Sequence, residues 1–146
     1  MEHTLLLQEG KWIAKGSYID GDTNVMAFQG ELVTTHGNKM WNHSTKMHLV
    51  TGNTRLEVQT SCDIIPFIKG NDTTTWNSDN PGIGILSGKF VVVDDSILSV
   101  CHCDTGEFEG TEYFLKVNDS YYKNRGTLTR KRAKLSSWVM ELTRVE

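Results

Sequence analysis

The sequence lacks features that would assign it to several classes of protein. The formal net charge of the 146-residue chain is −3, so nucleic acid is not an expected partner, because contact with phosphates needs a positive surface. No apolar run approaches the roughly 18 residues of a membrane-spanning helix. Residues 1–8 contain no basic segment followed by a long apolar one, so no secretory signal is recognised. We therefore expect a cytoplasmic protein without a membrane span.

Cysteine and proline are also scarce. The three cysteines, Cys62, Cys101 and Cys103, are an odd number, which favours reduced thiols over a disulfide framework. In an extended segment Cys101 and Cys103 share one face and His102 takes the other, so these three side chains do not form a metal site. We predict no metal and no cofactor.

The chain does contain short β-type segments separated by turn residues. Glycine is frequent, with 13 residues against 2 prolines, as tight hairpin turns require. Segments rich in Val, Ile, Thr and aromatic residues predict about ten strands: 10–19, 24–35, 39–50, 54–63, 72–79, 83–93, 96–103, 108–117, 121–130 and 134–145. Residues 3–9 are predicted as a short helix or 3₁₀ turn.

The short links between these segments predict antiparallel hairpins throughout. Closing the sheet removes the two open edges that ten consecutive strands would otherwise leave. We therefore expect an all-β protein, a single closed up-and-down barrel that occupies residues 1–146 as one domain, with little or no helix. An open two-sheet sandwich is the structural alternative.

The two ends of the barrel sequence resemble a known superfamily. Gly10-Lys11-Trp12 opens the first predicted strand, and Arg144 lies near the end of the last one. This arrangement is similar to that of the calycins, which include lipocalins, fatty-acid-binding proteins and nitrobindin-like barrels. The resemblance implies that Trp12 is buried at the barrel base with Arg144 across its ring, a favourable cation–π pair. It implies no haem, because no histidine lies near the C-terminus, and no fatty-acid lid, because the turn at residues 20–22 is short.

Alternation along the strands predicts an aromatic interior. A cavity lined by aromatic rings and a few polar groups is typical of a small-molecule site, so we expect a small, largely apolar or aromatic ligand. The predicted ligand-binding residues are Tyr18, Trp41, His43, Trp76, Tyr113 and Tyr122. Trp138 and Asn124 are expected to share the same interior. The alternative is that these rings simply fill the core.

Two other functions stay open at this point. An enzyme could use His43 with Tyr18 or Tyr122 for acid–base or isomerase chemistry, although no catalytic motif is present and no catalytic residue is assigned. An interaction module with a filled core could instead use the basic hairpin at residues 131–132 to bind an acidic partner or a second copy in a homodimer. The acidic residues at positions 107, 109 and 112 are expected to face solvent.

Overall fold

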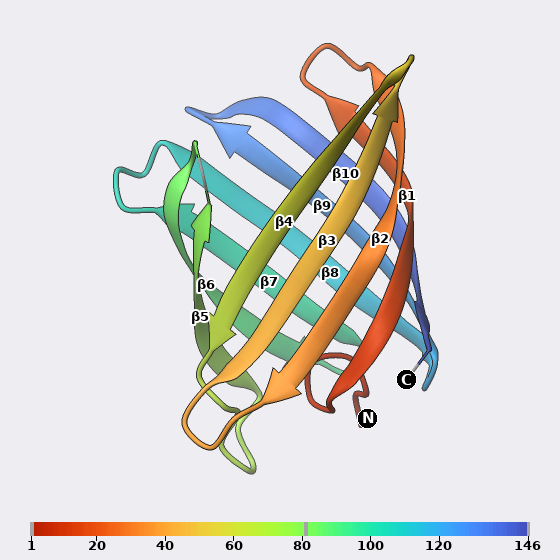
Figure 1. Cartoon of the computed structure of the whole chain (residues 1–146). Coiled ribbons are helices and arrows are strands. Elements are labelled where there is room, and N and C mark those ends of the chain that lie inside the picture. The colour runs from red at the N-terminus through yellow and green to blue at the C-terminus, as the bar shows by residue number, and fades with distance from the viewer. Residues whose placement is uncertain (1, 81, 146) are drawn as a thin grey trace.

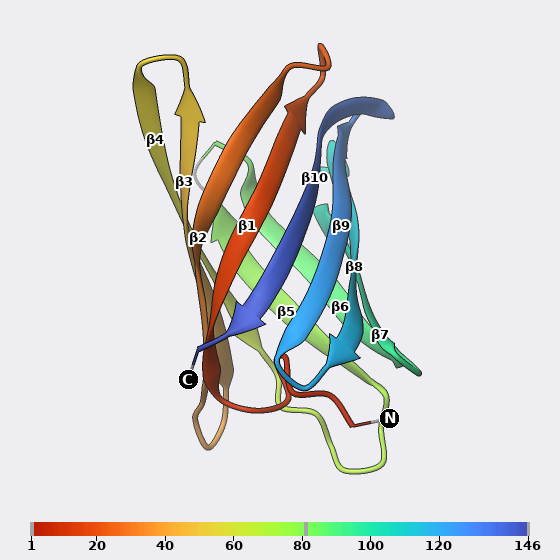
Figure 2. The same ribbon diagram turned by 90° about the vertical axis from the view of Figure 1, so that its right-hand side faces the viewer.

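Ten antiparallel strands make up the computed structural model, which describes residues 2–80 and 82–145 (Figure 1). The strands in chain order are β1 (Gly10–Asp20), β2 (Val25–His36), β3 (Trp41–Thr51), β4 (Thr54–Ile64), β5 (Thr73–Asn80), β6 (Gly84–Val93), β7 (Ser96–Cys103), β8 (Phe108–Asn118), β9 (Tyr121–Arg130) and β10 (Ala133–Arg144). Each strand pairs with its neighbours in sequence, and β1 pairs with β10, so the sheet is a closed barrel (Figures 1 and 2). The predicted closed up-and-down barrel is confirmed, and the open sandwich is not adopted.

Local sequence accounts for the position of the strands. Every predicted strand is present, and its ends lie within two residues of the predicted ones. Several hairpins turn at residues with positive φ, such as Gly52 with a φ of 59°. Lys131 and Arg132, with φ of 48° and 70°, form the exposed turn between β9 and β10. Two consecutive residues at positive φ are typical of the type I′ hairpin, which matches the twist of the flanking strands.

The N-terminal segment closes the lower end of the barrel and is not helical. Leu5 to Leu7 form turns, and Leu6 has a φ of 67°, so the predicted short helix at residues 3–9 is wrong. Leu5 and Leu6 are almost completely buried. His36 supports this turn, because its Nε2 donates to the Leu6 carbonyl at 2.8 Å. Burial of the two leucines under the barrel competes successfully with local helix formation.

At the barrel base, Trp12 and Arg144 pack as the calycin resemblance implied. The two residues are partners across β1 and β10, and the guanidinium carbon of Arg144 lies 5.9 Å from the Trp12 ring centre. Arg144 also donates to the side chain of Gln8 at 3.0 Å. The fully buried Tyr122 meets the Trp12 ring edge-on, with centroids 5.4 Å apart. The predicted base contact of Trp12 with Arg144 is therefore confirmed.

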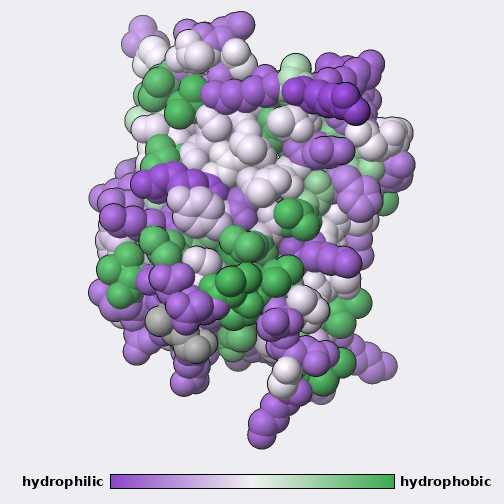
Figure 3. Space-filling model, turned by 180° about the vertical axis from the view of Figure 1, so that it is seen from behind, coloured by the Kyte–Doolittle hydropathy of each residue, from purple (hydrophilic) through white to green (hydrophobic). Residues whose placement is uncertain are grey.

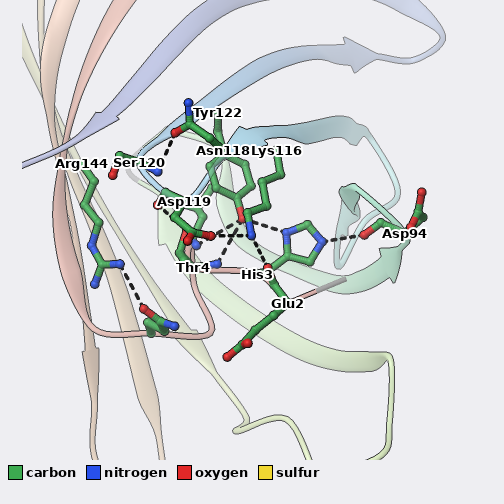
Figure 4. Close-up of polar contacts among 12 residues, drawn as sticks. Glu2, His3, Thr4, Asp94, Lys116, Asn118, Asp119, Ser120, Tyr122 and Arg144 are labelled. Carbon is green, nitrogen blue, oxygen red and sulfur yellow. Dashed lines mark hydrogen bonds and ion pairs between the residues drawn. The ribbon is translucent and has the colours of Figure 1, made fainter.

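A hydrogen-bond network ties the N-terminal segment to this base (Figure 4). Nε2 of His3 donates to the carbonyl of Asp94 at 2.8 Å, which leaves Nδ1 to accept from the Tyr122 hydroxyl at 2.8 Å. The Thr4 backbone N–H donates to the same hydroxyl at 3.2 Å. Burial lowers the pKa of His3, which favours the neutral ring that this network needs.

One side of the barrel is split between β4 and β5. Only three residue pairs join β4 to β5, from Cys62–Ser78 to Ile64–Trp76, and Figure 1 shows the upper part of β4 leaving β5. Leu56 and Val58 point toward the interior yet are 49% and 45% exposed. These two side chains are therefore partly open to solvent where β4 and β5 separate.

The outer surface is mixed in character. Figure 3 shows hydrophobic residues gathered low on the face opposite to that of Figure 1, among hydrophilic ones. Exposed apolar side chains on the outside of β7 and β8 include Leu98, Val100 and Val117. Among the residues described, no helix has the length and apolar character needed to span a membrane.

Candidate functional site

A cavity of about 280 Å³ lies inside the barrel above the N-terminal segment. Leu6, from that segment, lines it together with side chains from strands around the barrel. Most of the surface that lines the cavity is apolar, although about half of the lining residues carry a polar group: hydroxyls, thiols, one imidazole, one amide and one carboxyl. The principal lining residues are Leu32, His43, Thr45, Thr60, Cys62, Trp76, Ser78, Asn80, Leu86, Phe90, Ser99, Cys101, Glu112, Phe114, Trp138 and Met140.

Two indole rings in the cavity wall lie against glycines of neighbouring strands. A Cβ atom on Gly88 would overlap the ring of Trp76, and one on Gly126 would overlap the ring of Trp138. Because glycine has no side chain, each ring can lie close to the backbone of the next strand. Trp76 also packs against Phe90, with ring centroids 5.8 Å apart. The glycines thus leave the middle of the barrel free of these two large rings.

His43 is a neutral polar group in this apolar wall. Its Nδ1 lies 2.9 Å from the buried hydroxyl of Thr34. Burial lowers the pKa of His43 from 6.5 to about 4. Among the described residues no carboxylate and no tyrosine forms a hydrogen bond with His43, so the pairing with Tyr18 or Tyr122 considered for an enzyme is absent.

Glu112 is the carboxyl group of the cavity, and its position corrects the sequence analysis. It was expected in solvent, but it points inward on β8 and lines the cavity. Its Oε2 accepts two hydrogen bonds of 3.1 Å, from Nδ2 of Asn124 and from Nε1 of Trp138. Burial raises the pKa of Glu112, and these two hydrogen bonds oppose that rise. The signal that could have located it is alternation, since Glu112 shares a face with Gly110 and the buried Phe114.

The six predicted ligand-binding residues do not all reach this cavity. His43 and Trp76 line it. Tyr113 is 39% exposed and lies on the outer face of β8, so its predicted inward orientation is wrong. The prediction that Tyr113 points inward and the prediction that Glu112 points outward are the same error, because adjacent strand residues point to opposite faces.

The other three predicted residues are inside the barrel but outside the cavity lining. Tyr122 belongs to the base network described above. Trp41 stacks on His36, with ring centroids 3.8 Å apart, and also packs against Phe67. Tyr18 is half-buried against the core and pairs across the strands with Trp138.

Burial favours the protonated form of the two thiols of the cavity. Cys62 and Cys101 are free, and burial raises the pKa of both, that of Cys101 to about 11. A protonated thiol is a poor nucleophile and a poor metal ligand. The described part of the chain contains no group of three or more His, Cys, Asp or Glu side chains placed to hold a metal ion.

Comparison with solved structures agrees with the fold. An S-type phycobiliprotein lyase from Guillardia theta is 8% identical, with a TM-score of 0.68 over 96% of this chain and 89% of that one. Rv2717c from M. tuberculosis is 14% identical, with a TM-score of 0.66 over 99% of this chain and 100% of that one. Both solved structures share the fold of this barrel over nearly the whole length of each chain. No family model and no curated protein sequence matches the chain, and identities this low extend the likeness to the fold alone.

Proposed function

We propose that this barrel binds a small, largely apolar or aromatic molecule in its interior cavity. The observation that carries the proposal is the cavity of about 280 Å³, closed below by Leu6 and walled by Trp76, Trp138 and Phe90. Its volume lies near the lower end of ligand pockets, which begin at about 300 Å³, so the ligand is small, of the size of a few fused or linked rings. The likeness to a phycobiliprotein lyase is a weaker support, because a shared fold does not fix function.

The lining favours a molecule with few polar groups. Burial of an apolar ligand surface contributes roughly 25 cal/mol for each Å² removed from water. The polar side chains in the wall, among them His43, Thr45 and Glu112, then select orientation, as a small number of polar groups does in other ligand pockets. His43 and Trp76 remain predicted ligand contacts, and Glu112 and Trp138 join them.

A fluorescent probe and a cavity-filling variant test the proposal. N-phenyl-1-naphthylamine is neutral and aromatic, and its fluorescence rises in apolar surroundings. We expect the wild type to bind it with a Kd of about 0.2 mM or tighter, from roughly 0.3 kcal/mol for each non-hydrogen atom. Ser99 lines the cavity and is buried, so Ser99→Phe should fill the space and weaken binding at least about tenfold.

The matched control is the preceding residue of the same strand. Leu98 points outward and is 40% exposed, so Leu98→Phe adds an aromatic ring to β7 without entering the cavity. We expect Leu98→Phe to bind the probe like the wild type. Equal binding by wild type and Ser99→Phe, with both folded by circular dichroism, would contradict the proposal.

A further inference from the structure

Among the described residues, those that line the cavity include one carboxyl group and no lysine or arginine to neutralise it. Glu112 is the sole Asp, Glu, Lys or Arg among the described residues that line the space. The guanidinium of Arg125, which follows Asn124 in the sequence, donates to the backbone carbonyl of Asn124 at 2.8 Å and not to Glu112. A carboxylate in an apolar interior is costly unless a cation pairs with it or a proton neutralises it.

The hydrogen bonds leave one oxygen of Glu112 for a ligand. Asn124 and Trp138 both donate to Oε2, whereas Oε1 receives no hydrogen bond from the described residues. Since Oε2 already accepts two donors, a proton on the neutral acid resides on Oε1. The same Oε1 is therefore where a donor from a ligand would bind once the proton is lost.

We propose that the ligand of this cavity carries a cationic ammonium-type donor that binds Oε1 of Glu112 while its apolar part packs between Trp76 and Trp138. This inference rests on the proposed ligand-binding function and specifies the chemistry of the ligand. Hydrogen bonds between a cation and a carboxylate are among the strong ones in proteins.

The surroundings of Glu112 supply no competing charge near neutral pH. The titratable groups that face the same space are Cys62 on β4, Cys101 on β7 and His43 on β3. Burial keeps both thiols protonated and keeps the imidazole neutral, with a His43 pKa of about 4. A proton and a cationic ligand thus compete for Oε1, and cation binding weakens as the pH falls through the raised pKa of Glu112.

Three probes of nearly equal shape test the cationic ligand separately from the proposed ligand-binding function. We would titrate the full chain by calorimetry with 1-naphthylmethylammonium, 1-naphthylmethanol and 1-naphthoate. At pH 8 we expect the ammonium to bind about tenfold or more tightly than the alcohol, and the carboxylate to bind most weakly. At pH 5 the preference for the ammonium should fall, while the affinity for the alcohol stays constant.

Two variants locate the effect. Glu112→Gln keeps an acceptor for Asn124 and Trp138 but removes the charge, so the ammonium should lose about tenfold or more in affinity and the alcohol should keep its own. Glu109→Gln removes a carboxyl from the exposed outer face of the same strand and should bind all three probes like the wild type. The wild-type selectivity and its pH dependence remain decisive even if Glu112→Gln fails to fold.

Each result decides between the two claims. If the alcohol binds as tightly as the ammonium, or the carboxylate binds most tightly, the cavity binds ligands but the cationic inference is wrong. If Glu112→Gln keeps the ammonium preference, Glu112 is not its source, and the inference is also wrong. If none of the three probes binds, the proposed binding function itself fails, and the inference fails with it.

Discussion

Acid should destabilise this protein through His43, and the structure sets the size of the effect. The folded barrel holds the imidazole in an apolar wall and lowers its pKa from 6.5 to about 4. The unfolded chain therefore binds a proton between these pH values while the folded chain does not. By linkage, the free energy of unfolding falls as the pH drops from about 6.5 toward about 4.

The magnitude follows from that pKa difference. At about 1.4 kcal/mol for each pH unit, a fall in pH through the whole range from 6.5 to 4 lowers the free energy of unfolding by about 3 kcal/mol. Most of this loss, about 2.5 kcal/mol, has occurred by pH 4.5. The assay is urea unfolding at pH 7.5 and pH 4.5. Because carboxyl groups also titrate in acid, the comparison is made between the wild type and His43→Asn, whose amide can still pair with Thr34.

The difference between the two proteins isolates His43. We expect His43→Asn to lose about 2.5 kcal/mol less stability than the wild type between these two pH values. His102→Asn, at an exposed position on the outside of β7, should keep the pH dependence of the wild type. An identical pH dependence for wild type and His43→Asn would refute the buried, neutral state of His43.

Three further predictions concern the Tyr122 hydroxyl at the bottom of the barrel, the contact of Gly126 with the Trp138 ring, and the carboxyl group of Glu112. Tyr122→Phe removes the hydroxyl that serves His3 and the Thr4 backbone, so it should cost about 2 kcal/mol in urea unfolding. Tyr113→Phe, at an exposed position on the outer face of β8, should cost less than about 0.5 kcal/mol. Gly126→Ala should cost about 1–3 kcal/mol and change the near-ultraviolet circular dichroism, because its methyl group overlaps the Trp138 ring. Since burial raises the pKa of Glu112, the contribution of this group to the free energy of unfolding falls as the pH rises above about 4.5, opposite in sign to that of His43. Glu112→Gln should therefore be more stable than wild type at pH 8 and lose that advantage in acid.

Strand positions and barrel closure could be predicted because the information is local. In β4 the alternation of Leu56, Val58, Thr60 and Cys62 with charged and polar residues fixes the inner face without reference to the rest of the chain. The turn residues that separate the strands are equally local. Pairing of β1 with β10 then follows from the need to remove two open edges, and the Trp12–Arg144 contact was implied by the calycin resemblance.

The inner and outer faces of β8 could not be assigned as reliably from the sequence. Its outer face carries Tyr113, Leu115 and Val117, so hydrophobicity alone favours the wrong side. The inner face carries Glu112, whose burial is compensated by donors from Asn124 on β9 and from Trp138 on β10. That compensation depends on contacts between strands, which a single-strand pattern does not contain.

The hydrogen bonds of the N-terminal segment to Tyr122 at the closed lower end of the barrel were missed for a similar reason. His3 and Tyr122 are 119 residues apart in sequence and meet only after the barrel has closed. Tyr122 has the aromatic character expected of a ligand contact, and its inward orientation was predicted correctly. What alternation does not encode is its height in the barrel, which places it at the base beside Trp12 and not in the cavity.

The tryptophans provide the most direct test of ligand binding in the cavity. The chain contains four, and two of them, Trp76 and Trp138, line the cavity, while Trp12 is buried at the base and Trp41 stacks on His36. We would record the four indole N–H signals by ¹H–¹⁵N NMR during titration with N-phenyl-1-naphthylamine, assigning each by its Trp→Phe variant. Saturable shifts of Trp76 and Trp138, with Trp12 unchanged, are predicted. No shift at Trp76 and Trp138, or shifts confined to the other two signals, would contradict a ligand site in the barrel interior.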